Sequence, residues 1–197
     1  MPLPDRLRLP FHFEPDLLQR DLETLCAMDW TPHFVTQNYD GDWSVIALRA
    51  SAGARHPVTM IYSDPSATQF VDTPALERCP HFREVLERFA CELRAVRLMR
   101  LTPGSLIKEH RDHDLDAEEG MARIHIPVTS NPHVVFEVNR RQVDMAPGSV
   151  WYLRLSDPHR VANNGPADRV HLVIDAVVND WLQSVLERAA EEFAVTP

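Results

Sequence analysis

Two histidines and one aspartate have the residue types and the spacing of a metal site. His110 and Asp112 are two positions apart, so on an extended segment their side chains point to the same side. His159 comes from a distant segment and can complete one face of the coordination sphere. Two histidines and one carboxylate with open positions are typical of non-haem Fe(II) oxygenases, whose open positions take a 2-oxoacid and then dioxygen. The three residues therefore predict a catalytic ferrous site.

An arginine follows each of the two segments that carry the predicted ligands. The pattern Arg-x-His occurs twice within apolar stretches, at Arg123 to His125 and at Arg169 to His171. Strand alternation places Arg123 and His125 on one face, and a cationic face turned to a closed interior is costly unless anions compensate it. The alternative is that these faces point to solvent. The repetition favours a pocket lined for anions, in which Arg169 would supply the fixed cation that a dicarboxylic cosubstrate requires.

The other histidines are expected outside the ligand set. His113 neighbours Asp112 but has the wrong parity to share a strand face with His110, so we expect it behind the ligands or at the surface. Four more lie in proline-flanked or helix-start segments and are expected to be structural or solvated: His33, His56, His81 and His133.

Short strands separated by turn residues are the main pattern of the chain. The alternation of apolar residues and the turn signals predict strands at 43–49, 96–101, 105–110, 123–128, 134–138, 150–153 and 170–178. The stretches 51–57 and 63–74 are expected to be loops, and His159 is expected in a polar stretch that turns its side chain into a barrel mouth. This succession fits a mainly β fold of the antiparallel jelly-roll type, cupin-like, rather than alternating strands and helices.

Three amphipathic helices are predicted to flank these strands. Apolar residues recur at helical spacing over about 16–28, 80–93 and 180–193, and Pro80 stands where a first-turn proline would. The helices would cover the core at the N-terminus, before the central strands and at the C-terminus. We expect all 197 residues to form one domain.

Composition narrows the classes of function. The formal net charge is −9 and no Lys/Arg-rich block occurs, so a nucleic-acid partner is not expected. No apolar run approaches the roughly 18 residues of a membrane span, so no membrane is expected either. The three cysteines are widely spaced without any CxxC, and the first residues lack the apolar core of a signal peptide. These features favour a cytoplasmic protein in a reducing compartment.

Several segments together resemble a known family. The sequence is similar to the aspartyl/asparaginyl β-hydroxylases, a family of 2-oxoglutarate-dependent oxygenases that includes bacterial proline cis-hydroxylases. The resemblance is closest between Val96 and Asp175 and is carried by residues 97–104, 110–113, 123–127, 147–153, 158–159 and 169–175. It implies a double-stranded β-helix, bound Fe(II), and 2-oxoglutarate and O2 as cosubstrates.

The resemblance also implies a role for each candidate site residue. It implies His110, Asp112 and His159 as Fe(II) ligands and Arg169 as the residue that binds the distal carboxylate of 2-oxoglutarate. His125 would contact the metal-side carboxylate of the cosubstrate, and Arg123 would hold a substrate carboxylate or help with the cosubstrate.

Two positions distinguish this chain within the family. The animal peptide-hydroxylating branch has glycine where Asp112 stands, so the chain is more similar to the bacterial branch with a full triad. Met99 stands where the animal branch has a serine near the cosubstrate.

Three functional hypotheses follow from these observations. The first is hydroxylation of an unactivated C–H bond of an amino acid, free or bound in a peptide or to a carrier, with an enzyme of the proline cis-hydroxylase type as its closest variant. The second is a non-catalytic jelly-roll sensor of a small molecule that keeps the anion pocket. The third is a cupin-type isomerase or hydrolase with Zn(II) or Mn(II), which needs no arginine behind the distal ligand. The sequence leaves the oligomeric state open.

Overall fold

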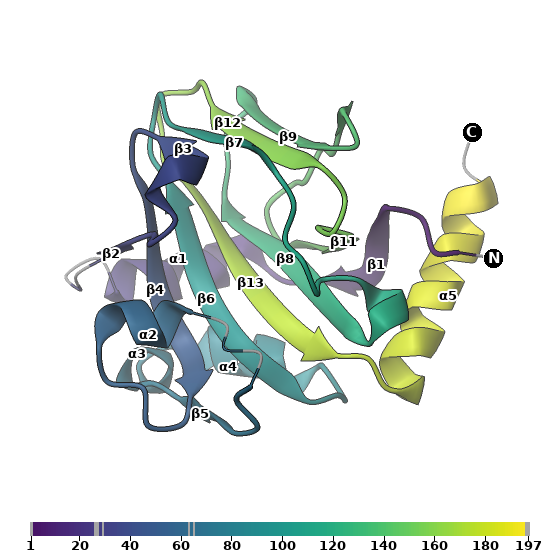
Figure 1. Cartoon of the computed structure of the whole chain (residues 1–197), viewed down its shortest axis with the longest axis horizontal. Coiled ribbons are helices and arrows are strands. Elements are labelled where there is room, and N and C mark those ends of the chain that lie inside the picture. Colours follow the sequence, from purple (N-terminus) through teal and green to yellow (C-terminus); the bar gives the residue numbers. More distant parts are fainter. Residues whose placement is uncertain (1, 26–27, 29, 63, 65, 196–197) are drawn as a thin grey trace.

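The computed structural model describes residues 2–25, 28, 30–62, 64 and 66–195. Two antiparallel sheets face each other and form the jelly roll that the sequence predicts (Figure 1). The larger sheet has the strand order β1-β11-β8-β13-β6-β4-β2, with β5 paired to β4, and the smaller sheet has the order β10-β9-β12-β7-β3. The larger sheet consists of β1 (Arg6–His12), β11 (Ser149–Leu153), β8 (Met121–Thr129), β13 (Arg169–Val177), β6 (Leu93–Leu101), β4 (Trp43–Ser51), β2 (Thr31–Pro32) and β5 (Phe70–Asp72). The smaller sheet consists of β10 (Arg141–Gln142), β9 (Val134–Val138), β12 (His159–Asn163), β7 (Leu106–His110) and β3 (Tyr39–Asp40).

The two faces of the larger sheet differ because side chains alternate along its long strands. On β8, Ile124 packs with Leu172 of β13 in the apolar cluster on one face. Arg123 and His125 turn to the other face and line a cavity together with Phe136 of the smaller sheet. Arg123 is 8 % exposed and His125 is 4 % exposed. The alternative that this face points to solvent is therefore wrong.

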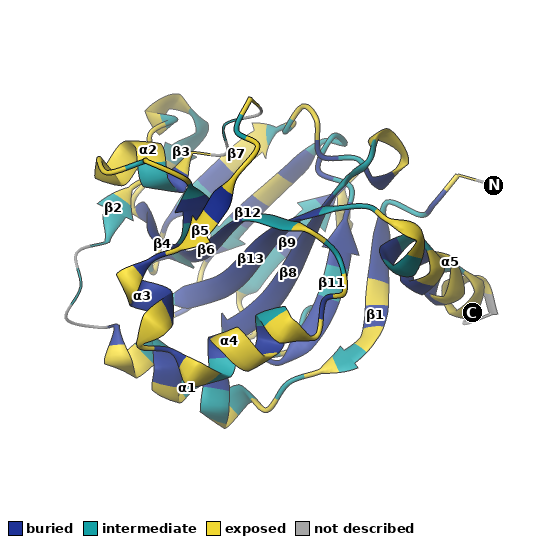
Figure 2. Cartoon of the chain, turned by 90° about the horizontal axis from the view of Figure 1, so that it is seen from below, coloured by how far each residue is buried: buried dark blue, intermediate teal, exposed yellow. Residues whose placement is uncertain are grey.

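Helices cover the outer, apolar face of the larger sheet (Figure 2). They are α1 (Pro15–Thr24), α3 (Pro74–Glu77), α4 (Pro80–Glu87) and, at the edge next to β1, α5 (Asp180–Val195). Within the described residues, no helix combines the length and the apolar character that crossing a membrane requires.

All three predicted helices are present, but two of them end earlier than predicted. The helix α5 confirms the last one, and α1 ends at Thr24 although the prediction ran to residue 28; residues 26 and 27 of that prediction lie outside the described residues. The helix predicted over 80–93 is too long, because α4 ends at Glu87. Leu93 instead begins β6 and pairs with Ala176 of β13. Leu93 fits the apolar pattern of the helix, but in the structure it pairs with the central sheet instead.

Several elements appear where the sequence predicted none. The strand β1 pairs with β11 at the edge of the larger sheet, and the strand β12 begins at His159, which was expected in a polar stretch. The strand β5 and the first residue of the helix α2 (Pro57–Ile61) fall in stretches expected to be loops. The strands β1, β5 and β12 pair with segments distant in the sequence, which local patterns do not reveal.

Asp21 ties α1 to the start of α4. Its carboxylate accepts a hydrogen bond from the backbone N–H of Phe82 (2.7 Å), and Asp21 is only 3 % exposed. We expect Asp21→Ala to lower the free energy of unfolding by about 1–2 kcal/mol, because it leaves a buried N–H of the first helical turn without its acceptor. The exposed Asp16→Ala on the same helix is the matched control, and denaturant unfolding measures both. Equal unfolding midpoints for the two variants would contradict this role.

Candidate active site

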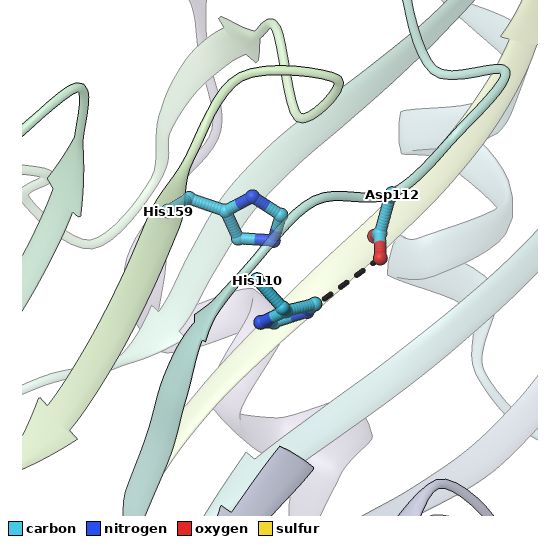
Figure 3. A group of neighbouring side chains, drawn as sticks. All are labelled: His110, Asp112 and His159. Carbon is cyan, nitrogen blue, oxygen red and sulfur yellow. Dashed lines mark ion pairs between the residues drawn. The ribbon is translucent and has the colours of Figure 1, made fainter.

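The structure brings together the three residues predicted to bind metal. His110 ends β7 and His159 begins β12, and the two are register partners in the smaller sheet. Asp112 follows two residues after β7, where its backbone N–H donates to the carbonyl of Leu155 (2.8 Å). One ligand atom from each of the three side chains lies within 4.8 Å of the others (Figure 3). Segments far apart in sequence thus converge where β7 ends and β12 begins, in the middle of the smaller sheet.

Backbone carbonyls orient both imidazoles. His110 Nδ1 lies 2.7 Å from the carbonyl oxygen of Lys108, and His159 Nδ1 lies 3.0 Å from that of Asp157. Each Nδ1 therefore carries the proton and donates it, which leaves each Nε2 as the nitrogen that can bind a metal. Burial lowers the pKa of His159 to about 4, so its ring is neutral near pH 7.

Arg123 fixes the orientation of Asp112. Its Nη1 donates to Asp112 Oδ2 (2.7 Å), and Asp112 Oδ1 lies 3.5 Å from Nε2 of His110. Arg123 is held in turn by Asp175, which accepts from its Nε (2.7 Å) and its Nη2 (3.0 Å). One carboxylate oxygen is thus engaged by the protein, while the other faces the histidines.

Asp175 and Arg97 are site residues to which the sequence analysis gave no role. Asp175 is fully buried, pairs across β8 and β13 with Arg123, and also binds Nη2 of Arg97. Arg97 lies in β6 opposite Val173, one diagonal step from Asp175. The sequence did contain a signal for them. Each is a charged residue within a long apolar stretch of the kind that forms a buried strand, where a charge is rare unless it is paired.

Arg169 occupies the interior without an acidic partner among the described residues. It is 2 % exposed, and burial lowers its pKa to about 9. Its Nη2 donates to His171 Nδ1 (2.8 Å), its Nε has no hydrogen-bond partner, and its guanidinium carbon lies 5.5 Å from the ring centre of Phe136. His125 lies beside this pair, with Nδ1 3.3 Å from His171 Nδ1 and a buried Nε2 that has no partner. A buried cation without a counter-ion favours binding of an anion.

Two cavities adjoin the metal-site residues: the first is lined by all three, and the second by His110 and Asp112. A narrow inner cavity of about 30 Å³ is lined by these residues together with His125, Arg169 and Phe136. A larger outer cleft of about 390 Å³ opens on the other side of the metal-site residues. Both cavities are lined by Trp43, Met99, His110, Asp112 and Arg123. Met99, which stands at a position where the family has a serine near the cosubstrate, therefore lies between the two spaces.

His33 was expected to be structural or solvated, but it lines the outer cleft. Its ring stacks on Trp43, with centroids 3.5 Å apart and an interplanar angle of 8°. Burial lowers the pKa of His33 to about 3, so the ring is neutral near pH 7. His113 also lines the cleft, at its exposed side. No periodicity in the sequence links His33 to β4, because their contact depends on the pairing of β2 with β4.

Comparison with known proteins assigns this architecture to a family. A family model described as aspartyl/asparaginyl β-hydroxylase matches residues 15–178. The chain is 24 % identical over 181 residues to an L-proline cis-4-hydroxylase of Rhizobium meliloti, a match that covers 91 % of this chain and 63 % of that protein. The chain thus spans less than two thirds of the length of this relative.

Solved structures share the fold. A 2OG-Fe(II) oxygenase family oxidoreductase from Burkholderia pseudomallei superposes with a TM-score of 0.53 at 17 % identity, covering 88 % of this chain and 85 % of that one. A prolyl-4-hydroxylase from Pseudomonas putida superposes with a TM-score of 0.53 at 14 % identity, covering 89 % and 93 %. At these identities the likeness concerns the fold.

Arg123→Lys tests whether the guanidinium positions Asp112. Lysine keeps the charge but cannot reach both carboxylates with a planar fork, so Asp112 loses its fixed orientation. We expect Mn(II) to bind roughly 10–100-fold more weakly, as for other residues that orient metal ligands. Calorimetric titration measures the affinity, with Arg94→Lys in the same cleft as the control. Unchanged Mn(II) affinity in Arg123→Lys would remove this role.

His159 should make the stability of the metal-free protein depend on pH. In the unfolded chain its pKa is near 6.5, and in the folded chain it is about 4. Between these values the unfolded state binds more protons, so the stability is fully present above pH 6.5 and is lost as the pH falls toward 4. We expect His159→Gln to reduce the slope of the unfolding free energy against pH in this range by up to about 1.4 kcal/mol per pH unit. Denaturant unfolding with chelator at several pH values measures it, and the exposed His133→Gln should leave the slope unchanged. Parallel profiles for His159→Gln and the unsubstituted protein would refute the prediction.

Proposed function

Because the chain belongs to the aspartyl/asparaginyl β-hydroxylase family, we propose that it is an Fe(II)- and 2-oxoglutarate-dependent dioxygenase that hydroxylates an unactivated C–H bond of an amino acid or amino-acid residue. The observation that carries the proposal is the buried guanidinium of Arg169, which lines the same cavity as His110, Asp112 and His159. A dicarboxylate suits this pair of features, because one carboxylate can bind at the metal and the other can neutralise Arg169.

The donor set fits a ferrous ion. Two neutral imidazoles and one carboxylate would hold the metal on one face and leave positions open, through Nε2 of His110, Nε2 of His159 and Oδ1 of Asp112. When bound, the ion supplies the redox chemistry by which O2 oxidises 2-oxoglutarate to succinate and carbon dioxide while the substrate C–H becomes C–OH.

The protein's own residues would orient the cosubstrate and exclude water. Arg169 would take the distal carboxylate, with His171 holding the guanidinium in place through its Nδ1. His125 offers a buried Nε2 without a partner, and in the tautomer with its proton on Nε2 it would donate a hydrogen bond to the metal-side carboxylate. The apolar side chains of Phe136 and Leu155 line the inner cavity and would keep water from the reacting groups.

Arg169 also separates this proposal from the alternatives. A cupin-type isomerase or hydrolase does not need a buried cation behind the metal. A buried guanidinium without a counter-ion lowers the stability of the folded protein, so Arg169 would have no use in such an enzyme. A non-catalytic sensor would bind 2-oxoglutarate without producing succinate. For the substrate, the similarity to an L-proline cis-4-hydroxylase makes proline the first amino acid to test. Cys79 and Cys91 are free thiols, which supports a reducing compartment such as the cytoplasm.

Arg169→Met tests the proposal by removing the charge at similar length. We expect 2-oxoglutarate to bind the Mn(II)-loaded protein at least roughly 100-fold more weakly, while Mn(II) affinity stays within about threefold, because a buried charge pair is lost and the metal ligands are untouched. The ligand-free variant should be at least as stable as the unsubstituted protein, because an uncompensated buried charge is gone.

Calorimetry and denaturant unfolding measure these effects, and an assay with Fe(II), ascorbate and an amino-acid panel measures succinate. Arg100→Met is the matched control. Arg100 lies on the neighbouring strand β6, next to Leu101, which is the register partner of Arg169. The proposal fails if the unsubstituted protein binds no 2-oxoglutarate, or if Arg169→Met binds it as well as the unsubstituted protein does.

A further inference from the structure

Aromatic rings form one wall of the outer cleft. Trp43 lies nearest the metal-site residues, with its ring centroid 6.4 Å from that of His110. His33 stacks on Trp43 and also on Phe34, at 4.7 Å and 19°. Phe34 meets Tyr62 edge to face at 5.6 Å. We call His33, Phe34, Trp43 and Tyr62 the aromatic wall; it runs without interruption from the metal-site residues to the rim of the cleft.

The outer end of the aromatic wall is exposed. Phe34 is 39 % exposed and Tyr62 is 44 % exposed. Val58, one helical turn before Tyr62 on α2, is 37 % exposed, so three of the five large exposed hydrophobic residues in the described part of the chain lie at this rim. Phe34 and Tyr62 line the cleft, whereas Val58 lies beside Tyr62 outside it. Exposed apolar groups that cluster beside a cleft indicate a contact surface.

Cationic side chains form another part of the cleft. Arg97 and Arg123 line it from β6 and β8. Each guanidinium has five N–H donors, of which Arg97 uses two and Arg123 uses three in hydrogen bonds to protein groups. Two more arginines and three aspartates also line the cleft: Arg94, Arg111, Asp64, Asp112 and Asp114. Nε of Arg97 is buried and has no hydrogen-bond partner among the described residues. The cleft therefore combines guanidinium donors that the protein does not fully use with an aromatic surface.

The aromatic wall is fixed relative to these guanidinium groups. Arg97 Nη1 donates to the carbonyl oxygen of Ile61 (3.0 Å), the residue that precedes Tyr62. The backbone N–H of His33 donates to the carbonyl of Trp43 (2.8 Å). The two binding surfaces are thus held at a set separation before any ligand arrives, which favours a ligand that spans both.

The cleft is larger than one amino acid needs. Its volume of about 390 Å³ lies within the roughly 300–1,000 Å³ of sites that bind drug-sized molecules. The cosubstrate's cation, Arg169, is not among its lining residues, so this space is left for the substrate.

Building on the proposed function, we infer that the substrate is an amino acid with a free carboxylate whose nitrogen carries an apolar acyl group. The carboxylate would bind at Arg97 and Arg123, and the acyl group would lie on Phe34 and Tyr62. Such a group occurs at the C-terminus of a peptide and in an acylated amino acid, and the two share this chemistry. A free amino acid would leave the aromatic wall without a contact.

Each of the twenty amino acids is tested in four forms: free, N-phenylacetylated, N-phenylacetylated with an amidated carboxylate, and as the C-terminal residue of a dipeptide after phenylalanine. Succinate formation gives kcat/KM, and calorimetry with Mn(II) and an unreactive 2-oxoglutarate analogue gives the affinity. For the amino acid that is hydroxylated, we expect the N-phenylacetyl form or the dipeptide to exceed the free form at least tenfold in both measures. Amidation should remove this gain. The stronger of the two acylated forms identifies the source, peptide or acyl conjugate.

Substitutions in the cleft, with one outside it as a control, test which residues bind the acyl group. Phe34→Ala and Tyr62→Ala should each lower the affinity for the acylated form roughly three- to tenfold more than the affinity for the free form, as expected for the loss of one aromatic contact. Phe193→Ala, 50 % exposed on α5 and absent from the cleft lining, is the control. The inference is overturned if the free amino acid is the better substrate, if the amide is equally good, if the cleft variants behave like Phe193→Ala, or if no form binds a protein that holds Mn(II) and 2-oxoglutarate. Failure to bind 2-oxoglutarate would overturn the proposed function itself.

Discussion

The arrangement of the site depends on one fully buried carboxylate, that of Asp175. It lies between Arg97 and Arg123 on the face of the larger sheet that looks toward the smaller one. Removing two guanidinium groups from water costs several kcal/mol each, and only an ion with good geometry offsets that cost. Asp175 does so because it is the cross-strand partner of Arg123 and the diagonal neighbour of Arg97. Because Asp175 holds Nε and Nη2 of Arg123, the Nη1 of Arg123 is fixed in a position where it orients Asp112.

Arg169 shows the opposite use of buried charge. It shares its strand face with Asp175, yet no carboxylate of the described residues pairs with it. Among the described residues, its side chain contacts the neutral ring of His171 and the face of Phe136. The folded chain bears this cost because the rest of the sheet is apolar and well packed around it. Functional sites commonly hold such local instability, which the binding of a complementary ligand removes.

Much of this could be predicted from the sequence because it depends on local periodicity. Alternation gave most central strands and placed Arg123 with His125 on the interior face, and the spacing of His110 and Asp112 gave two of the three residues that the structure brings together. The strand β12 escaped prediction because it starts in a polar turn and its register with β7 shifts between His159 and Val161. The roles of His33 and Arg97 depend on which strands become neighbours, and no window of sequence contains that information.

A continuous series of contacts joins the cleft rim to the metal-site residues. It runs from the Ile61 carbonyl through Arg97, Asp175 and Arg123 to Asp112, and every step is a hydrogen bond to a charged group. Coupling between two sites requires an element with two discrete arrangements, and this series of hydrogen bonds inside a packed sheet has one. The series therefore acts as a rigid support rather than as a switch. Its effect is to hold the guanidinium groups of Arg97 and Arg123 and the carboxylate of Asp112 at fixed positions relative to the aromatic wall.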